Sequence, residues 1–93
     1  VNITTTMFVV YPNPFNPSVA IGGVLKFMNL LPGEIVEIYS ISGQRVWEGE
    51  EAGESVVKWS GMNRNGEKVA QGVYFYVIKN AHRKKTGRIF LQR

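Results

Sequence analysis

The sequence predicts an all-β fold, an antiparallel β-sandwich of about seven strands. Apolar and polar residues alternate with a period of two in several short segments, and glycine, proline and asparagine separate these segments. No amphipathic pattern of helical period has a useful length. With 93 residues, of which 44% are hydrophobic, the chain is long enough for one core and too short for two. We therefore expect a single domain over residues 1–93, in which residues 1–10 are a lead-in strand or linker from a larger protein.

The N-terminal part predicts two strands on either side of a proline-rich segment. The first strand is expected over Met7 to Val10, and the segment YPNPFNPS follows at residues 11–18. Pro14 and Pro17 have no amide hydrogen and favour extended backbone in the residues before them, so we expect a fixed, extended lead-in. Phe15 then either closes the end of the sandwich, which we favour, or projects towards a partner.

The apolar run VAIGGVLKF predicts the next core strand. Its glycines indicate a bulge or bend, and four apolar residues are expected on one face: Val19, Ile21, Leu25 and Phe27.

Five further strands are expected in the remainder of the chain. They cover residues 34–41, 45–47, 54–59, 72–79 and 88–91, and the run GVYFYVIK at 72–79 is the richest in aromatic and β-branched residues. Gly43 supplies the positive φ of a hairpin turn, and Asn65-Gly66 forms a tight reversal in the long turn at 60–68. In the strand at 54–59, alternation places Ser55, Val57 and Trp59 on one face.

A local motif indicates that the predicted sandwich is immunoglobulin-like. The run Gly72-Val73-Tyr74-Phe75-Tyr76 has the Gly-x-Tyr-x-Cys pattern of a central immunoglobulin strand, with Tyr76 where the cysteine would be. We expect the Tyr74 hydroxyl to bind the preceding corner of the chain. Trp59 is expected to fill the space between the sheets in place of a disulfide.

The charge is distributed unevenly along the chain. The net charge of +4 combines a balance of −3 over residues 1–67 with +7 over residues 68–93, where no acid occurs. A basic C-terminal end attracts anionic partners, although solvated charges that discourage aggregation of a strand edge are the commoner case. The aromatic strand beside these charges does not predict nucleic-acid binding, because the chain lacks the helices and the basic start of an RRM.

Catalytic chemistry is not indicated. The chain has no cysteine, no aspartate and a single histidine, His82, which we expect to be exposed in a turn. The glutamates at 48–54 crowd one glycine-containing loop and are interpreted as solvated charges. In the segment MNRNGE, Asn63 and Asn65 stand where a calcium loop would have carboxylates, and Gly61 occupies the first ligand position, so we interpret it as a turn. We therefore predict a protein that is not an enzyme and has no metal and no cofactor, and no apolar run is long enough to span a membrane.

Four segments in order resemble a known family. YPNPFNPS, IYSISGQRV, the run from VVKWSG to GVYFYVI, and TGRIFLQR together resemble the C-terminal sorting domain of type IX secretion substrates over residues 11–93. Residues 36–78 are also similar to the immunoglobulin-like domain of flagellar hook-capping proteins. The resemblance to sorting domains implies a non-catalytic module of a larger bacterial protein, which is exported through the periplasm to the cell surface or the medium. It implies recognition by an outer-membrane translocon and removal or anchoring by a sortase-like peptidase.

The family's motifs fall on particular residues. Pro12, Asn13, Pro14 and Phe15 match its opening motif, Gly43 its hairpin glycine, Gly72 and Tyr74 its glycine-tyrosine strand, and Trp59 its tryptophan. The sequence departs from the family at Ser40 and Ser60, where aspartate is common.

The terminal basic-apolar strand, residues 88–93, supplies the candidate contacts with the translocon: Lys85, Arg88, Leu91 and Arg93. Two alternatives stay open, an assembly module of hook-cap type and a carbohydrate-binding accessory domain that would use exposed Trp47 and Tyr39.

Overall fold

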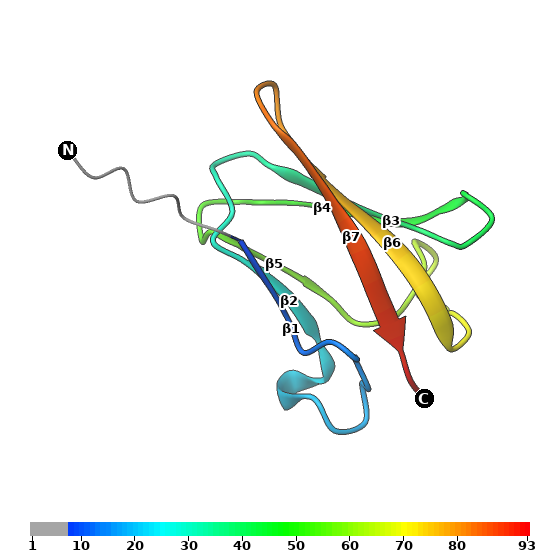
Figure 1. Cartoon of the computed structure of the whole chain (residues 1–93). Coiled ribbons are helices and arrows are strands. Elements are labelled where there is room, and N and C mark those ends of the chain that lie inside the picture. Colours follow the sequence, from blue (N-terminus) through cyan, green and yellow to red (C-terminus); the bar gives the residue numbers. More distant parts are fainter. Residues whose placement is uncertain (1–7) are drawn as a thin grey trace.

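Residues 8–93, the part that the computed structural model describes, form two antiparallel sheets packed face to face (Figure 1). The three-stranded sheet has the order β1-β2-β5, and the four-stranded sheet has the order β4-β3-β6-β7. This arrangement confirms the predicted all-β, immunoglobulin-like sandwich. The strands are β1 (Val9–Tyr11), β2 (Leu25–Met28), β3 (Ile35–Tyr39), β4 (Arg45–Glu50), β5 (Val56–Trp59), β6 (Gly72–Lys79) and β7 (Lys84–Leu91).

The core lies between the sheets and is centred on Trp59. Its ring is fully buried and contacts Phe15, Trp47 and Tyr74, with ring centroids 6.0–6.5 Å apart. The indole nitrogen donates a hydrogen bond of 2.8 Å to the Met62 carbonyl, so the polar atom of this large side chain is satisfied. Trp59 therefore fills the inter-sheet space as predicted.

The tyrosine of the predicted corner makes the expected contact. The Tyr74 hydroxyl donates a hydrogen bond of 2.5 Å to the carbonyl of Ala70, four residues earlier in the chain. This contact fixes the start of β6 to the corner before it. At the β3–β4 hairpin Gly43 has a φ of 90°, so the prediction of a positive φ at this position is also confirmed.

Three sequence predictions about strands need correction. The strand expected over Val19 to Phe27 begins only at Leu25, because Ile21–Gly23 form a 3-10 turn, η1, in which both glycines have positive φ. Val19 and Ile21 are consequently exposed, at 78% and 87%, while Leu25 and Phe27 are buried as predicted. Ser55 does not continue the face of Val57 and Trp59, since its φ of 63° places it before β5.

The third correction concerns the last strand, which begins at Lys84 rather than near Arg88. It pairs with β6 over its full length, from Gly72 opposite Leu91 to Lys79 opposite Lys84. At the other end of the chain the first strand is Val9–Tyr11, and Met7 of the prediction lies outside the described residues. Within residues 8–93, no helix has the length and apolar character needed to cross a membrane.

Candidate functional site: a proline loop that clasps the last strand

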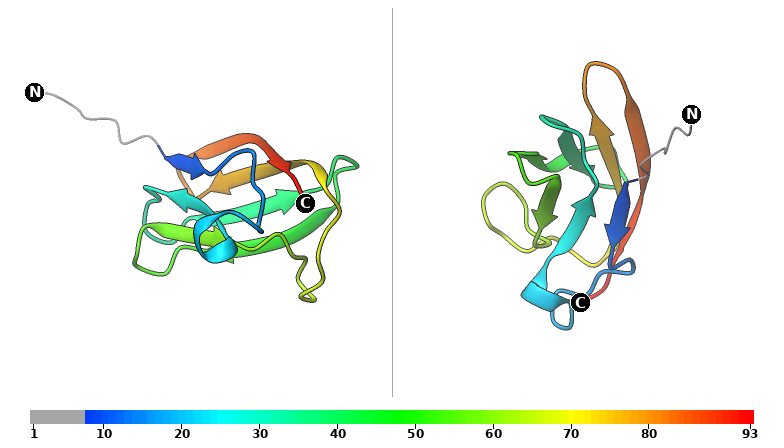
Figure 2. Two further views of the ribbon diagram at one scale, coloured as in Figure 1. Left: turned by 90° about the horizontal axis from the view of Figure 1, so that it is seen from below. Right: turned by 90° about the vertical axis from the view of Figure 1, so that its left-hand side faces the viewer.

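The proline-rich segment, Pro12 to Pro17, connects the two sheets and is called the proline loop below. It leaves β1 at the edge of the three-stranded sheet and reaches β7 at the edge of the four-stranded sheet, on the same side of the sandwich (Figure 2). The loop thus brings the end of the first strand, β1, into contact with the last strand, β7. Its peptide bonds before Pro12 and Pro14 are cis.

Phe15 fixes the proline loop to β7 through its backbone and to the core through its side chain. Its amide donates to the Phe90 carbonyl at 2.7 Å, and its carbonyl accepts from the Gln92 amide at 2.8 Å, in a short parallel bridge. The phenyl ring is fully buried against Trp59. Of the two roles considered for Phe15, the structure shows the one that closes the end of the sandwich.

Asn13 extends this contact along β7 with its side chain. The amide nitrogen donates to the Arg88 carbonyl at 2.8 Å, and Oδ1 accepts from the Phe90 amide at 3.0 Å. Asn13 thus presents a donor and an acceptor to the edge of β7, as the backbone of a neighbouring strand would. We call the contacts of Asn13 and Phe15 with β7 the clasp. Sequence reasoning matched Asn13 to a motif but missed this role.

The last residue is also held in place. The Arg93 guanidinium donates from Nε to the Val69 carbonyl at 2.7 Å and from Nη2 to the Gly61 carbonyl. Its backbone amide binds the Gln71 side chain. Gly61 has a φ of 80°, and a Cβ atom there would lie 3.0 Å from Arg93 Nη2, so glycine suits this close approach.

The four candidate translocon contacts differ in accessibility. Lys85 and Arg88 are exposed on β7, whereas the Leu91 side chain is buried in the core. The Arg93 guanidinium is engaged by the loop carbonyls described above. Among these residues, Lys85 and Arg88 are therefore the ones with charges free to meet a partner.

The structure brings most of the motif residues together at one end of the sandwich. The proline loop packs on Trp59 through Phe15, and Trp59 in turn contacts Tyr74. Gly43 lies apart, in the β3–β4 hairpin, where its amide binds the Ser40 carbonyl at 2.9 Å.

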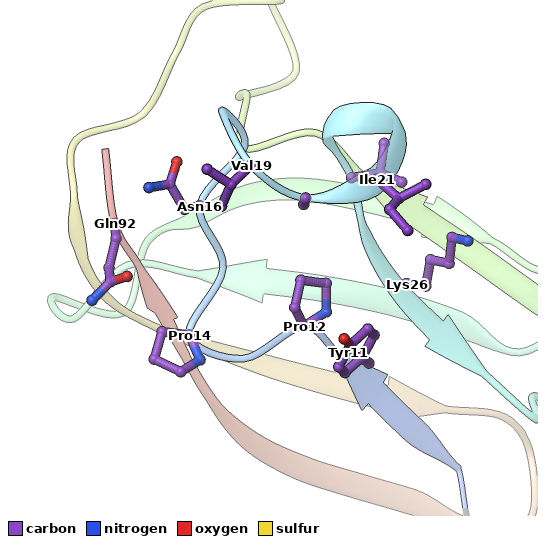
Figure 3. Close-up of a pocket in the computed structure, with 10 residues that line it drawn as sticks. Tyr11, Pro12, Pro14, Asn16, Val19, Ile21, Lys26 and Gln92 are labelled. Atoms are coloured by element: carbon purple, nitrogen blue, oxygen red, sulfur yellow. The ribbon is translucent and has the colours of Figure 1, made fainter.

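A partly open groove of about 350 Å³ lies beside the proline loop (Figure 3). Exposed apolar side chains of Tyr11, Val19 and Ile21 line it together with Pro12 and Pro14, and Lys26 and Gln92 stand at its margin. The sequence predicts Val19 and Ile21 on one face of a core strand, so it does not indicate this groove.

Three buried carboxylates have structural partners. Glu34 accepts two hydrogen bonds from the Arg83 guanidinium, from Nε at 2.6 Å and from Nη2 at 2.8 Å. This hydrogen bonding holds the pKa of Glu34 below the usual range. Glu51 accepts amide hydrogen bonds from Ser55, Gly33 and Gly53, which lower its pKa. Its burial corrects the interpretation of all the glutamates at 48–54 as solvated charges.

The third carboxylate, Glu37, lies on the outer face of the four-stranded sheet. Burial opposes its ionised form, but hydrogen bonds from Lys79, Arg45 and Tyr39 outweigh burial and lower its pKa. His82 is exposed in its turn, as predicted. Within residues 8–93 no three potential ligands from His, Cys, Asp and Glu lie close enough to hold a metal ion.

The aromatic pair considered for carbohydrate binding is not on one surface. Trp47 pairs with Ile38 and faces the core, where its ring contacts Trp59. Tyr39, the next residue after Ile38, points to the opposite face and donates its hydroxyl to Glu37. The two rings therefore cannot form one platform for a sugar.

Comparison with known proteins identifies the family. The chain belongs to the CHU_C Type IX secretion signal domain family, whose model matches residues 9–92. No curated protein sequence matches the chain.

Two solved structures from Porphyromonas gingivalis are similar in fold. PorZ, described as an essential bacterial surface component of the type-IX secretion system, is 27% identical with a TM-score of 0.76. The match covers 92% of this chain and 11% of PorZ. Dimeric latent PorU is 19% identical with a TM-score of 0.64, over 90% of this chain and 9% of PorU. The chain thus spans about a tenth of the length of either protein.

Proposed function

We propose that this chain is the non-catalytic sorting domain of a larger exported bacterial protein and directs that protein through type IX secretion. The observation that carries the proposal is the family match over residues 9–92. The passenger is the rest of the protein, attached on the N-terminal side, and its destination is the cell surface or the medium. A sortase-like peptidase then removes or anchors the domain.

The clasp supports the proposal that the secretion machinery recognises the folded surface of this domain. A partner recognises a preformed surface with a small loss of entropy, because the surface is ordered before binding. The clasp orders the end of β7 through hydrogen bonds with Asn13 and Phe15. We infer that the translocon contacts two of the exposed cations of β7, Lys85 and Arg88, beside this ordered end.

An export assay tests the proposal. Residues 1–93 are fused to the C-terminus of a periplasm-targeted reporter and expressed in a type IX-competent host and in its translocon-deficient derivative. We expect reporter outside the outer membrane in the competent host alone. Equal release by both strains, or retention by both, would contradict the proposed function.

Charge reversal then tests the proposed contact. Removing residues 88–93 is unsuitable, because it also deletes Ile89 and Leu91 from the core. Lys85→Glu/Arg88→Glu changes only exposed residues, and Lys58→Glu/Arg64→Glu makes the same charge change at other exposed sites. We expect the first double variant to lose most of its export and the second to retain it. Equal export of both would remove Lys85 and Arg88 from the recognised surface.

A further inference from the structure

The edge of β7 is divided into a covered half and an open half. β7 is the last strand of its sheet, and in an antiparallel pair the backbone groups of successive residues alternate between facing the partner and facing away. The clasp binds the Arg88 carbonyl, both backbone groups of Phe90, and the Gln92 amide. These groups all belong to even-numbered residues, so the backbone amides and carbonyls of the even-numbered residues of β7 point away from β6.

The same alternation leaves the first half of the edge unpaired. The amides and carbonyls of Lys84 and Thr86, and the Arg88 amide, face outwards and have no hydrogen-bond partner within residues 8–93. Gly87 lies between them and presses its backbone against the Tyr76 ring. The open edge, Lys84 to Arg88, has about the length of an ordinary β-strand.

Side-chain charges give the open edge a specific character. Lys84, Lys85 and Arg88 are exposed and form no ion pair within the described residues. The nearby Lys79 and Arg83 are already paired, with Glu37 and Glu34. Three unpaired positive charges therefore lie along the part of β7 whose outer backbone edge is open.

Like charges also limit what the open edge can accept. A second copy of β7 would bring the same cations against it, and such repulsion is how natural sheets avoid edge-to-edge association. An extended segment rich in acidic residues would meet the opposite sign and gain both backbone hydrogen bonds and ion pairs. Edge addition of this kind obtains affinity from the backbone and specificity from the side chains.

We propose that the open edge of β7, Lys84 to Arg88, binds an extended acidic segment of a partner protein as an added strand, with the clasp setting where that strand ends. The inference deepens the proposed function and rests on it for the biological role, since the partner is then a component of the export machinery. The binding itself can be measured without it.

One variant blocks strand addition without disturbing the sheet. Thr86→Pro removes an outward-facing amide and places the ring where the added strand would lie, while the bonds to β6 remain. Thr86→Val keeps the amide and is the matched control. Circular dichroism and thermal unfolding establish that both variants fold.

The first measurement is an NMR titration with a terminally blocked eight-residue peptide of alternating glutamate and valine, at low salt. We expect the amide signals of Lys84, Thr86 and Arg88 to shift, and the affinity to be about tenfold lower for Thr86→Pro than for Thr86→Val. A lysine-valine peptide should not bind. Equal affinity of the two variants, equal binding of both peptides, or shifts confined to another surface would overturn the proposal.

The second measurement is the export assay with the same variants. We expect Thr86→Pro to be exported poorly and Thr86→Val normally. If both are exported equally, the open edge has no role in export while the proposed function stands. If the unaltered domain is not exported, the proposed function fails, and the peptide titration still decides whether the edge binds an acidic strand.

Discussion

Asn13 occupies a position where the backbone cannot supply the groups that the edge of β7 requires. Its neighbours on both sides are prolines, so the chain passes β7 with few amide donors. The asparagine side chain carries a donor and an acceptor on one planar group, which matches the spacing of the Arg88 carbonyl and the Phe90 amide. Proline and asparagine in this motif therefore have complementary roles.

Replacing Asn13 tests this role directly. Asn13→Ala removes two hydrogen bonds and should lower the free energy of unfolding by about 1–3 kcal/mol, since each bond contributes about 0.5–1.5 kcal/mol. The Phe90 amide should also exchange faster with solvent. Asn13→Asp keeps the acceptor for Phe90 and loses the donor to Arg88, so protection of Phe90 should persist. Unchanged exchange in Asn13→Ala would contradict the clasp.

Phe15 is expected to contribute more than Asn13, because its ring is fully buried between the loop and Trp59. Phe15→Ala should lower the free energy of unfolding by about 3–5 kcal/mol through lost burial and the cavity that remains. Phe90→Ala is the control, because Phe90 lies on β7 beside Phe15 and is 44% exposed. Chemical denaturation measures both. Similar losses for the two variants would show that Phe15 does not close the core.

At the scale of single elements, β7 depends on the contact between Gly87 and the residue opposite it, Tyr76. A Cβ atom on Gly87 would overlap with the phenol ring of Tyr76. Gly87→Ala should therefore destabilise the domain by about 1–3 kcal/mol, the usual cost of overpacking. In a Tyr76→Leu background the same substitution should cost less, because the ring is absent. Equal costs in both backgrounds, measured by urea denaturation, would exclude this steric cause.

The loops at the ends of β3 and β4 depend on ionised carboxylates. The hydrogen bond from Arg83 lowers the pKa of Glu34, and amide hydrogen bonds, that of Ser55 first, lower the pKa of Glu51. A folded-state pKa below the unfolded value near 4.5 means that the stabilisation is present above that value. It is then lost as the pH falls through the folded pKa.

We therefore expect the free energy of unfolding to decline as the pH falls below about 4.5. Glu34→Gln should lower it at pH 7 and weaken its decline in acid. Glu54→Gln changes an exposed side chain in a neighbouring loop and serves as the control. Urea denaturation between pH 2.5 and 7 measures all three proteins. An acid decline in Glu34→Gln as steep as in the unaltered domain would exclude Glu34 as a cause.

How far the sequence predicted the structure differs between strands and loops. Strands such as β6 follow from alternation, because side chains of period two must face either the core or the solvent. The prediction of one strand over residues 19–27 was wrong, because two glycines with positive φ convert the first half of this run into a turn. The exposure of Val19 and Ile21 depends on that conformation. Contacts such as Asn13 with Arg88 join residues 75 apart in the sequence, and no local pattern predicts them.

On the scale of the whole molecule, the fluorescence of Trp59 can show whether the two sheets and the proline loop unfold together. It belongs to the three-stranded sheet, while Trp47 and Tyr74 reach it from the four-stranded sheet and Phe15 from the proline loop. Its fluorescence therefore depends on contacts among all three parts, whereas far-ultraviolet circular dichroism reports the strands themselves. If one core unites the sheets, both signals should change in a single transition with the same midpoint.

Urea unfolding followed by both signals tests the prediction of one domain over this chain. The second tryptophan, Trp47, is removed by Trp47→Phe so that the fluorescence reports Trp59 alone. We expect coincident curves in this variant, and coincident curves again at a lower urea concentration when Phe15→Ala is added, because the loop is part of the same cooperative unit. An early fluorescence change with strands still intact would instead mean that the proline loop opens separately from the sandwich. The clasp would then be a local closure of a domain that is stable without it.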